Sequence, residues 1–143
     1  HAATDLLAEA KLSPELRNEA LYYRAKAYAK QKADKKALED YRELAKDTRN
    51  SYGAEAKYQV AQSLYDAKEY AAAEKELLNY IEQSTPHAYW LARSFVLLSD
   101  VYHATGKDLD ARQYLLSLQQ NYQGNDDIQS MIESRLHKLK VEN

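Results

Sequence analysis

The chain has 143 residues, of which 45% are hydrophobic and 29% are charged. This composition excludes an intrinsically disordered chain, and the length is enough for one domain with a buried core. The 20 basic and 22 acidic side chains leave a net charge of −2, which excludes a general attraction to nucleic acid or to anionic membranes. Cysteine is absent, so disulfides and thiolate metal sites are excluded.

The chain opens with part of a helical pattern. Residues 2–12 place Ala3, Leu7 and Ala10 on one stripe, as in the second helix of a preceding unit whose first helix is missing. We therefore expect this sequence to belong to a longer array. Insertion into a membrane is not expected, because apolar runs such as Phe95 to Leu98 are far shorter than the roughly 20 residues of a spanning helix.

The first full unit is predicted at residues 14–49. Ser13 is a favourable helix cap and Pro14 is tolerated in the first turn. The helical stripe is interrupted near residues 32–35, so two antiparallel helices joined by a tight turn are expected. The apolar positions of this unit are Leu21, Ala25, Tyr28, Ala37, Leu38, Tyr41, Leu44 and Ala45.

Two similar units and a single helix follow. Residues 50–86 begin at Asn50 and end at Pro86, because proline disfavours helix in the residue before it. Residues 87–124 turn at Gly106 and stop at Gly124. Residues 125–141 are predicted to form a capping helix that covers the last pair and faces water outside. Its single apolar stripe consists of Ile128, Met131, Ile132, Leu136 and Leu139.

Small residues recur at a fixed spacing in all three pairs. A small residue in each first helix is followed 12 positions later by an alanine in the second helix, and the units repeat after 36 and then 38 residues. Two helices approach closely only where the side chains at their crossing are small. The pattern predicts an all-α solenoid of antiparallel helix pairs. The residues are Ala25 and Ala37, Ala61 and Ala73, and Ser99 and Ala111.

These positions resemble the tetratricopeptide repeat family. Its first-helix pattern is a large apolar residue, two residues, a large–small pair, two residues and then Tyr. Arg24 and Lys57 depart from this pattern, and Gly106 alone keeps the usual glycine of the turn within a pair, where Lys32 and Lys68 stand in the other units. The matching segments are Leu21, Arg24-Ala25 and Tyr28; Lys57, Val60-Ala61 and Leu64; and Phe95, Leu98-Ser99 and Tyr102.

The resemblance implies a right-handed superhelix whose concave face, lined by the first helices, binds peptide segments or partner helices. The unit lengths of 36 and 38 residues are more similar to bacterial cell-envelope members of the family, which suggests a periplasmic or envelope location. By analogy, partner-binding residues on the concave face would be Tyr22, Lys26, Tyr58, Gln62, Tyr65, Arg93, Asp100 and His103. Glu55 falls on the same face.

The three tyrosines of that set have two interpretations. Tyr22, Tyr58 and Tyr65 would form an aromatic stripe suited to a binding surface, because tyrosine offers a large apolar face with a polar tip. Alternatively, they pack between layers, as aromatic residues on a helical stripe usually do. Of the residues that would grip a partner's C-terminal carboxylate in some family members, only Arg93 fits, so that mode of binding is not expected.

Catalysis, metal binding and nucleic-acid binding find little support in the sequence. Gly53, Gly106 and Gly124 are isolated, so no phosphate-binding loop is formed, and no nucleophile elbow is present. Asp100 and His103 lack a third ligand for a metal. The basic cluster from Arg24 to Lys36 is interpreted as a solvated helix end. We therefore predict a non-catalytic protein–protein interaction scaffold without cofactor. The alternative is a structural spacer within a larger multi-repeat cell-envelope protein.

Overall fold

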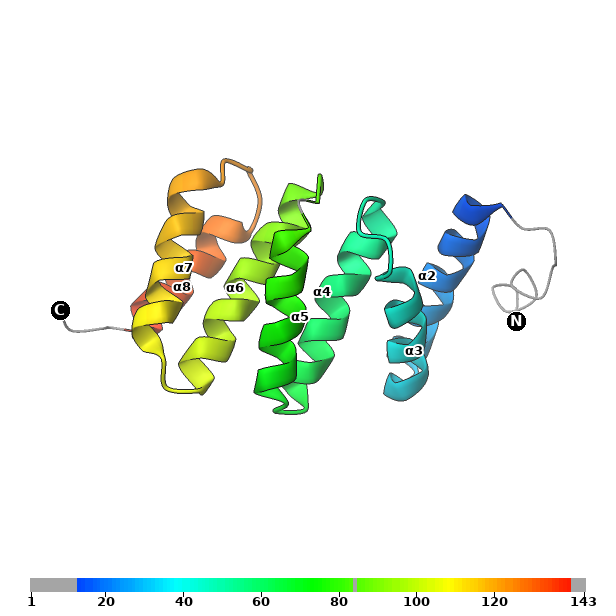
Figure 1. Ribbon diagram of the computed structural model, residues 1–143, viewed down its shortest axis with the longest axis horizontal. Helices are drawn as coiled ribbons and strands as arrows, with labels where there is room; N and C mark the ends of the chain where they lie inside the picture. Colours follow the sequence, from blue (N-terminus) through cyan, green and yellow to red (C-terminus); the bar gives the residue numbers. More distant parts are fainter. Residues whose placement is uncertain (1–12, 84, 140–143) are drawn as a thin grey trace.

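The computed structural model describes residues 13–83 and 85–139, and over these residues the regular secondary structure consists of α-helices joined by turns and short loops (Figure 1). The predicted half-pair at residues 2–12 lies outside the described residues. The described helices are α2 (Pro14–Lys30), α3 (Asp34–Leu44), α4 (Ser51–Asp66), α5 (Tyr70–Glu82), α6 (Ala88–Ala104), α7 (Asp108–Asn121) and α8 (Ile128–Leu139).

The helices follow one another along the long axis of the molecule in chain order (Figure 1). Each helix packs on the next, and α2 also touches α4, α4 touches α6, and α6 touches α8. No such contact joins α3 to α5 or α5 to α7. The helices α2, α4, α6 and α8 therefore form one continuous face, which we call the first-helix face. The helices α3, α5 and α7 stand apart on the opposite side, which we call the second-helix face.

Local signals in the sequence set the starts of two of the first helices. The Ser13 side chain accepts a hydrogen bond from the Leu16 backbone N–H at 3.2 Å at the start of α2. The Asn50 side chain accepts one from the Gly53 backbone N–H at 2.8 Å at the start of α4. Each bond satisfies one of the backbone donors that a helix start leaves without an intrahelical partner.

The turns within the three pairs share one conformation despite different residues. Lys32, Lys68 and Gly106 have φ angles of 61°, 63° and 80°, in the left-handed region. The residue after each donates its backbone N–H to a carbonyl five residues earlier, as at Ala33 to Tyr28 and Lys107 to Tyr102. This is the Schellman arrangement that ends many helices. The two lysines therefore occupy a conformation that glycine adopts at lower cost.

The predicted small residues are buried. Ala25 and Ala37 belong to one cluster of core residues, and Ala61 and Ala73 belong to another. Ser99 is buried and donates its hydroxyl to the Val96 carbonyl at 2.6 Å, so this polar residue stays satisfied in the core. The prediction that these residues mark helix packing sites is confirmed for the first two pairs by their shared clusters.

The two charged departures from the repeat pattern have partners. Arg24 donates from Nε and Nη2 to the carboxylate of Asp40 on α3, at 2.8 and 2.7 Å. Lys57 contacts Glu76 Oε2 at 3.1 Å and donates to Asn79 Oδ1 at 2.8 Å, both on α5. A charged group in a core position is tolerated when it is paired and hydrogen-bonded. Here each ion pair links the two helices of one pair.

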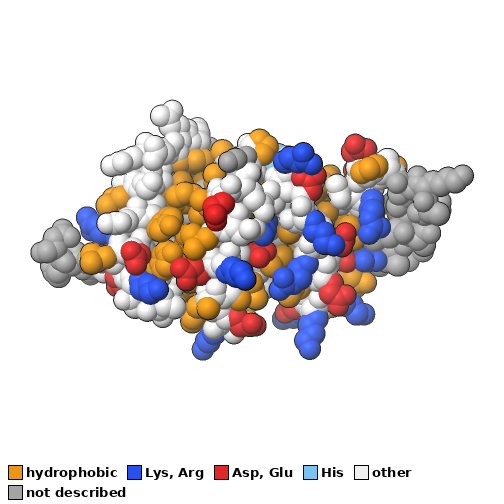
Figure 2. Space-filling view, viewed as in Figure 1, with side chains coloured by type: hydrophobic (Ala, Val, Ile, Leu, Met, Phe, Trp, Pro, Cys, Tyr) orange, Lys and Arg blue, Asp and Glu red, His pale blue; other side chains and the backbone are white. Residues whose placement is uncertain are grey.

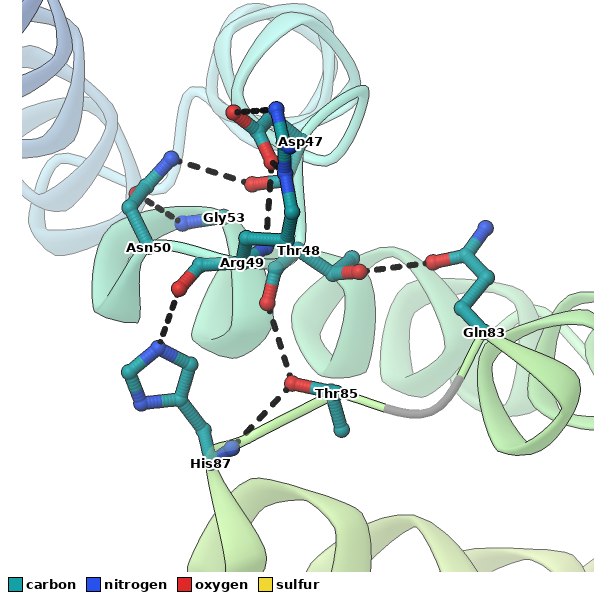
Figure 3. A network of polar contacts seen from close by, with 8 residues as sticks. All are labelled: Asp47, Thr48, Arg49, Asn50, Gly53, Gln83, Thr85 and His87. Carbon is teal, nitrogen blue, oxygen red and sulfur yellow. Dashed lines mark hydrogen bonds and ion pairs between the residues drawn. The ribbon is translucent and has the colours of Figure 1, made fainter.

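A polar network joins the loops that connect successive pairs (Figure 3). Thr85 donates its hydroxyl to the Thr48 carbonyl at 3.0 Å, and Thr48 donates to Gln83 at 2.7 Å. His87 Nε2 lies 2.8 Å from the Arg49 carbonyl. The loop before α4 is thus tied to the loop before α6 by contacts between residues 35 to 38 positions apart in the sequence.

Helix α8 does more than cover the end of the stack. Ile128 and Ile132 are fully buried against the α6–α7 pair, as the predicted apolar stripe requires. However, α8 touches α6 as well as α7, which is the relation that α6 has to α4 and α5. Its side chains therefore join the first-helix face as well as the exposed end of the molecule.

Candidate binding surface

The N-terminal part of the first-helix face is crosslinked by Glu55 of α4. Tyr22 donates its hydroxyl to Glu55 Oε1 at 2.9 Å, and Lys26 Nζ lies 2.9 Å from Glu55 Oε2. Burial and the hydrogen bond to Glu55 raise the pKa of Tyr22. Burial lowers the pKa of Lys26, but hydrogen bonding to Glu55 and its charge outweigh this effect and raise it. Both predicted residues are therefore engaged in linking α2 to α4.

Tyr58 lies in the core between α4 and α6. Its exposed fraction is 5%, its hydroxyl donates to Gln62 Oε1 at 2.9 Å, and its ring lies 5.6 Å from that of Trp90. Tyr22 and Tyr65 are partly exposed. Among the described residues, Tyr22 pairs with Tyr23 and Tyr52, and Tyr65 pairs with Tyr70. No pair joins the three predicted tyrosines, so packing describes Tyr58 better than an exposed aromatic stripe does.

Arg93 is a partly buried cation held by neutral groups. Its Nη1 donates to the Tyr89 hydroxyl at 2.8 Å and its Nη2 to the Tyr58 hydroxyl at 3.0 Å. The guanidinium carbon lies 4.8 Å from the centre of the Tyr58 ring. Among the described residues, no carboxylate oxygen comes within 4.0 Å of its nitrogens, and its buried Nε has no hydrogen-bond partner.

A pocket of about 290 Å³ opens on the C-terminal part of the first-helix face, between α4, α6 and α8. Four of the eight predicted binding residues line it together: Gln62, Tyr65, Asp100 and His103. The remaining predicted residues, Tyr22, Lys26, Tyr58 and Arg93, lie outside this pocket. The rest of the lining consists of Ser99, Arg135, Lys138 and Leu139.

The polar side chains in the pocket are mostly engaged with neighbours. Asp100 receives two hydrogen bonds from Arg135, each of 3.2 Å, and His103 Nδ1 lies 2.9 Å from Asp108 Oδ1. Gln62 donates to Asp66 at 2.9 Å. Burial, together with the nearby charge of Asp100, raises the pKa of Tyr65. The pocket is thus a preformed polar concavity with Tyr65 and Leu139 as its largest apolar surfaces.

Sequence reasoning missed the contribution of α8 to this pocket. The unit spacing of 36 to 38 residues, counted from Ser99, leads to Arg135, Leu136 and His137, where no small residue stands. Nothing in the local pattern therefore marks this helix as equivalent to α2, α4 and α6. The only usable signal was the order of helices, since a helix that follows a complete pair can pack on both of its members.

The described part of the chain contains no group of three or more His, Cys, Asp or Glu side chains arranged to hold a metal ion. Its helices also include none that combines the length and the apolar character needed to cross a membrane.

No protein-family model, no curated protein and no solved structure matches this chain. The resemblance to tetratricopeptide repeats therefore stays a prediction from the sequence pattern. The helix order, the recurring left-handed turns and the buried small residues are compatible with it.

Proposed function

We propose that this chain is a tetratricopeptide-like helical scaffold whose first-helix face binds a peptide segment of a protein partner. The observation that carries the proposal is the pocket between α4, α6 and α8, because it brings together four residues that the resemblance assigns to the binding face. A preformed concavity with convergent polar groups and a few apolar walls suits a ligand. The proposed role involves no catalytic step and no cofactor.

Arg93 supports the same proposal. A cation that is partly removed from water loses hydration, and a carboxylate normally compensates it. Arg93 has two tyrosine hydroxyls and the Tyr58 ring instead. An acceptor from a partner would add to these contacts without displacing an internal ion pair.

The test is a selection of peptides from a random displayed library on the immobilised protein, followed by mapping of a selected peptide by backbone NMR. Resonance shifts should concentrate in α4, α6 and α8. Replacement Tyr65→Ala should weaken binding at least about tenfold, since an aromatic anchor in a binding site typically contributes 1–2 kcal/mol or more.

Tyr114→Ala is the matched control. Tyr65 and Tyr114 are both half-buried and each lies 5.6 Å from a second tyrosine ring, but Tyr114 is on α7. Shifts confined to α3, α5 and α7, or equal losses of affinity in the two variants, would contradict the proposal.

The alternative function is a structural spacer within a larger multi-repeat envelope protein. It is favoured by one observation, namely that polar contacts on the first-helix face already link successive helices, as at Glu55 and Asp100. The same selection separates the two functions, because a spacer should enrich no peptide on this face.

A further inference from the structure

In the pocket between α4, α6 and α8, most hydrogen-bond acceptors already have a partner within the part of the chain that the structure describes, whereas several donors do not. Most acceptors are occupied: both oxygens of Asp100 accept from Arg135, and Gln62 Oε1 accepts from Tyr58. The His103 ring is held by Asp108 through Nδ1, which leaves its Nε2 without a described partner and open to a ligand. Ser99 directs its hydroxyl to the Val96 carbonyl. What remains available to a ligand is mainly a set of donors.

These donors come from α8 and α4. Arg135 binds Asp100 through Nε and Nη2, which leaves Nη1 with no partner among the described residues. Lys138 is exposed, and no described carboxylate oxygen lies within 4.0 Å of its Nζ. The Tyr65 hydroxyl likewise has no hydrogen-bond partner in the described part of the chain.

The charged side chains of the pocket lining also favour a ligand that accepts hydrogen bonds. The lining carries two cations, Arg135 and Lys138, against one carboxylate, Asp100, which Arg135 already neutralises. Two further carboxylates lie outside the lining and are engaged with it: Asp66 accepts from Gln62, and Asp108 lies 2.9 Å from His103 Nδ1. A group that offers several acceptors and a negative charge would therefore complete the pocket, and charge-assisted hydrogen bonds of this kind are stronger than neutral ones.

We propose that this pocket receives an acidic side chain, Asp or Glu, of the bound peptide segment, and that Lys138 together with Arg135 selects it. This inference rests on the proposed function, since it names the partner chemistry of the same face. The apolar walls formed by Tyr65 and Leu139 would hold an aliphatic neighbour of the acidic residue. Helix α8 thereby becomes the element that determines specificity.

The test uses two defined probes: acetyl-Ala-Leu-Glu-Leu-Ala-amide and the same peptide with Gln in place of Glu. Their blocked ends leave the Glu carboxylate as the single charge. Titrations are followed by NMR at Tyr65, Asp100, His103 and Arg135. The Glu peptide should bind about three- to tenfold more tightly than the Gln peptide, in the range expected for one partly exposed charge-assisted contact.

Lys138→Gln should abolish most of this preference, whereas Lys75→Gln should leave it unchanged. Lys75 is also an exposed lysine without an ion pair among the described residues, and it lies on α5. Both variants replace surface residues, so folding should be retained; matching amide spectra check this.

Three results would overturn the inference: equal affinities of the two peptides, a preference that survives Lys138→Gln, or no shift at the pocket residues at millimolar peptide. Selected library peptides that bind the first-helix face without an acidic residue would refute the acidic pocket while leaving the proposed function standing. Peptides that bind only on the second-helix face would refute both.

Discussion

The α4–α5 and α6–α7 pairs are each linked by a side-chain contact at equivalent positions, but the two contacts differ in chemistry. Lys57 and Phe95 each precede the buried small residue of their helix by four positions, and Glu76 and Tyr114 each follow the alanine of the second helix by three. Lys57 forms an ion pair with Glu76 at 3.1 Å, whereas Phe95 packs edge to face against Tyr114 with ring centres 5.7 Å apart. The repeat therefore specifies where two helices are linked and leaves the kind of link free.

The difference reaches the surface of the molecule. Figure 2, viewed as in Figure 1, shows hydrophobic side chains gathered between α5 and α7, while charged side chains lie between α3 and α5. The exposed groove beside α5, of about 890 Å³, includes Glu69, Glu76, Glu82 and Arg42 in its lining. By contrast, a smaller pocket between α6 and α7 is lined by Leu91, Phe95 and other mostly apolar residues.

The junctions before the two pairs also differ. Gly53 and Leu91 stand eight positions before Ala61 and Ser99. A Cβ atom at Gly53 would lie 1.8 Å from the Asp47 carbonyl oxygen and 2.8 Å from that of Leu44, so α4 approaches the end of α3 more closely than a side chain allows. The equivalent position in α6 accommodates a leucine, which is partly exposed.

Gly53→Ala should have the largest effect. The added methyl meets backbone rather than a movable side chain, so we expect the free energy of unfolding to fall by about 3 kcal/mol, at the upper end of the range for overpacking. Urea denaturation followed by circular dichroism measures it. Ser51→Ala, on the exposed side of the same first turn, is the control and should change stability by less than about 0.5 kcal/mol. Similar values for both would refute the close approach.

Ala61→Leu should cause the second-largest loss of stability. Ala61 is fully buried where α4 meets α5, so three extra carbon atoms should cost about 2 kcal/mol and lower the melting temperature clearly. Ala71→Leu introduces the same change at an exposed position of α5 and should leave the melting temperature nearly unchanged. If calorimetry finds equal shifts, Ala61 does not mark a tight helix packing site.

Replacing the ion pair of α4–α5 by the aromatic pair of α6–α7 should change the free energy of unfolding by less. Lys57→Phe alone and Glu76→Tyr alone should each cost about 1–2 kcal/mol, because one partner of a mostly buried ion pair is left behind. The double variant, which copies Phe95 and Tyr114, should regain at least about 1 kcal/mol of the summed loss. A double-mutant cycle measured by chemical denaturation gives this coupling, and strict additivity would show that the two positions are not equivalent to the aromatic pair.

The smallest expected effect is at the turns. Lys68 has a φ of 63°, and Gly106 at the equivalent position of the next pair has 80°. Lys68→Gly should raise the free energy of unfolding by about 0.5–1 kcal/mol, since glycine relieves the left-handed strain and this gain exceeds its entropic cost. Gly106→Ala should lower stability by a similar amount, because an added Cβ there meets no atom within 4 Å and only the φ penalty acts. Thermal melts of both variants, with opposite signs of the shift, would bear this out.

The sequence predicted the features that arise within one or two helical turns. Ser13 and Asn50 indicated helix starts and Gly106 a turn, because capping and left-handed backbone depend on the local residue. The spacing of Ala25, Ala37, Ala61 and Ala73 predicted buried packing sites, since only small side chains allow close crossing. The right-handed superhelix and its envelope location depended on the resemblance alone and stay predictions.

The candidate site was predicted only in part. The resemblance to tetratricopeptide repeats implied that Gln62, Tyr65, Asp100 and His103 share the concave face, and they line one pocket. Helical periodicity could not assign Tyr58 between core and surface, because a residue at the edge of an apolar stripe is buried or exposed according to how closely the neighbouring helix approaches.

The sequence by itself determined the all-α class, the helix pairs and the small residues between them, because these follow from short-range backbone preferences and from residue size. Only the tertiary structure decided which polar side chains meet across the helices. The pairs Arg24 with Asp40 and Arg135 with Asp100 join residues 16 and 35 positions apart. Such contacts depend on the relative rotation and depth of packed helices, which no local pattern specifies, and the same packing brings α8 into the binding face.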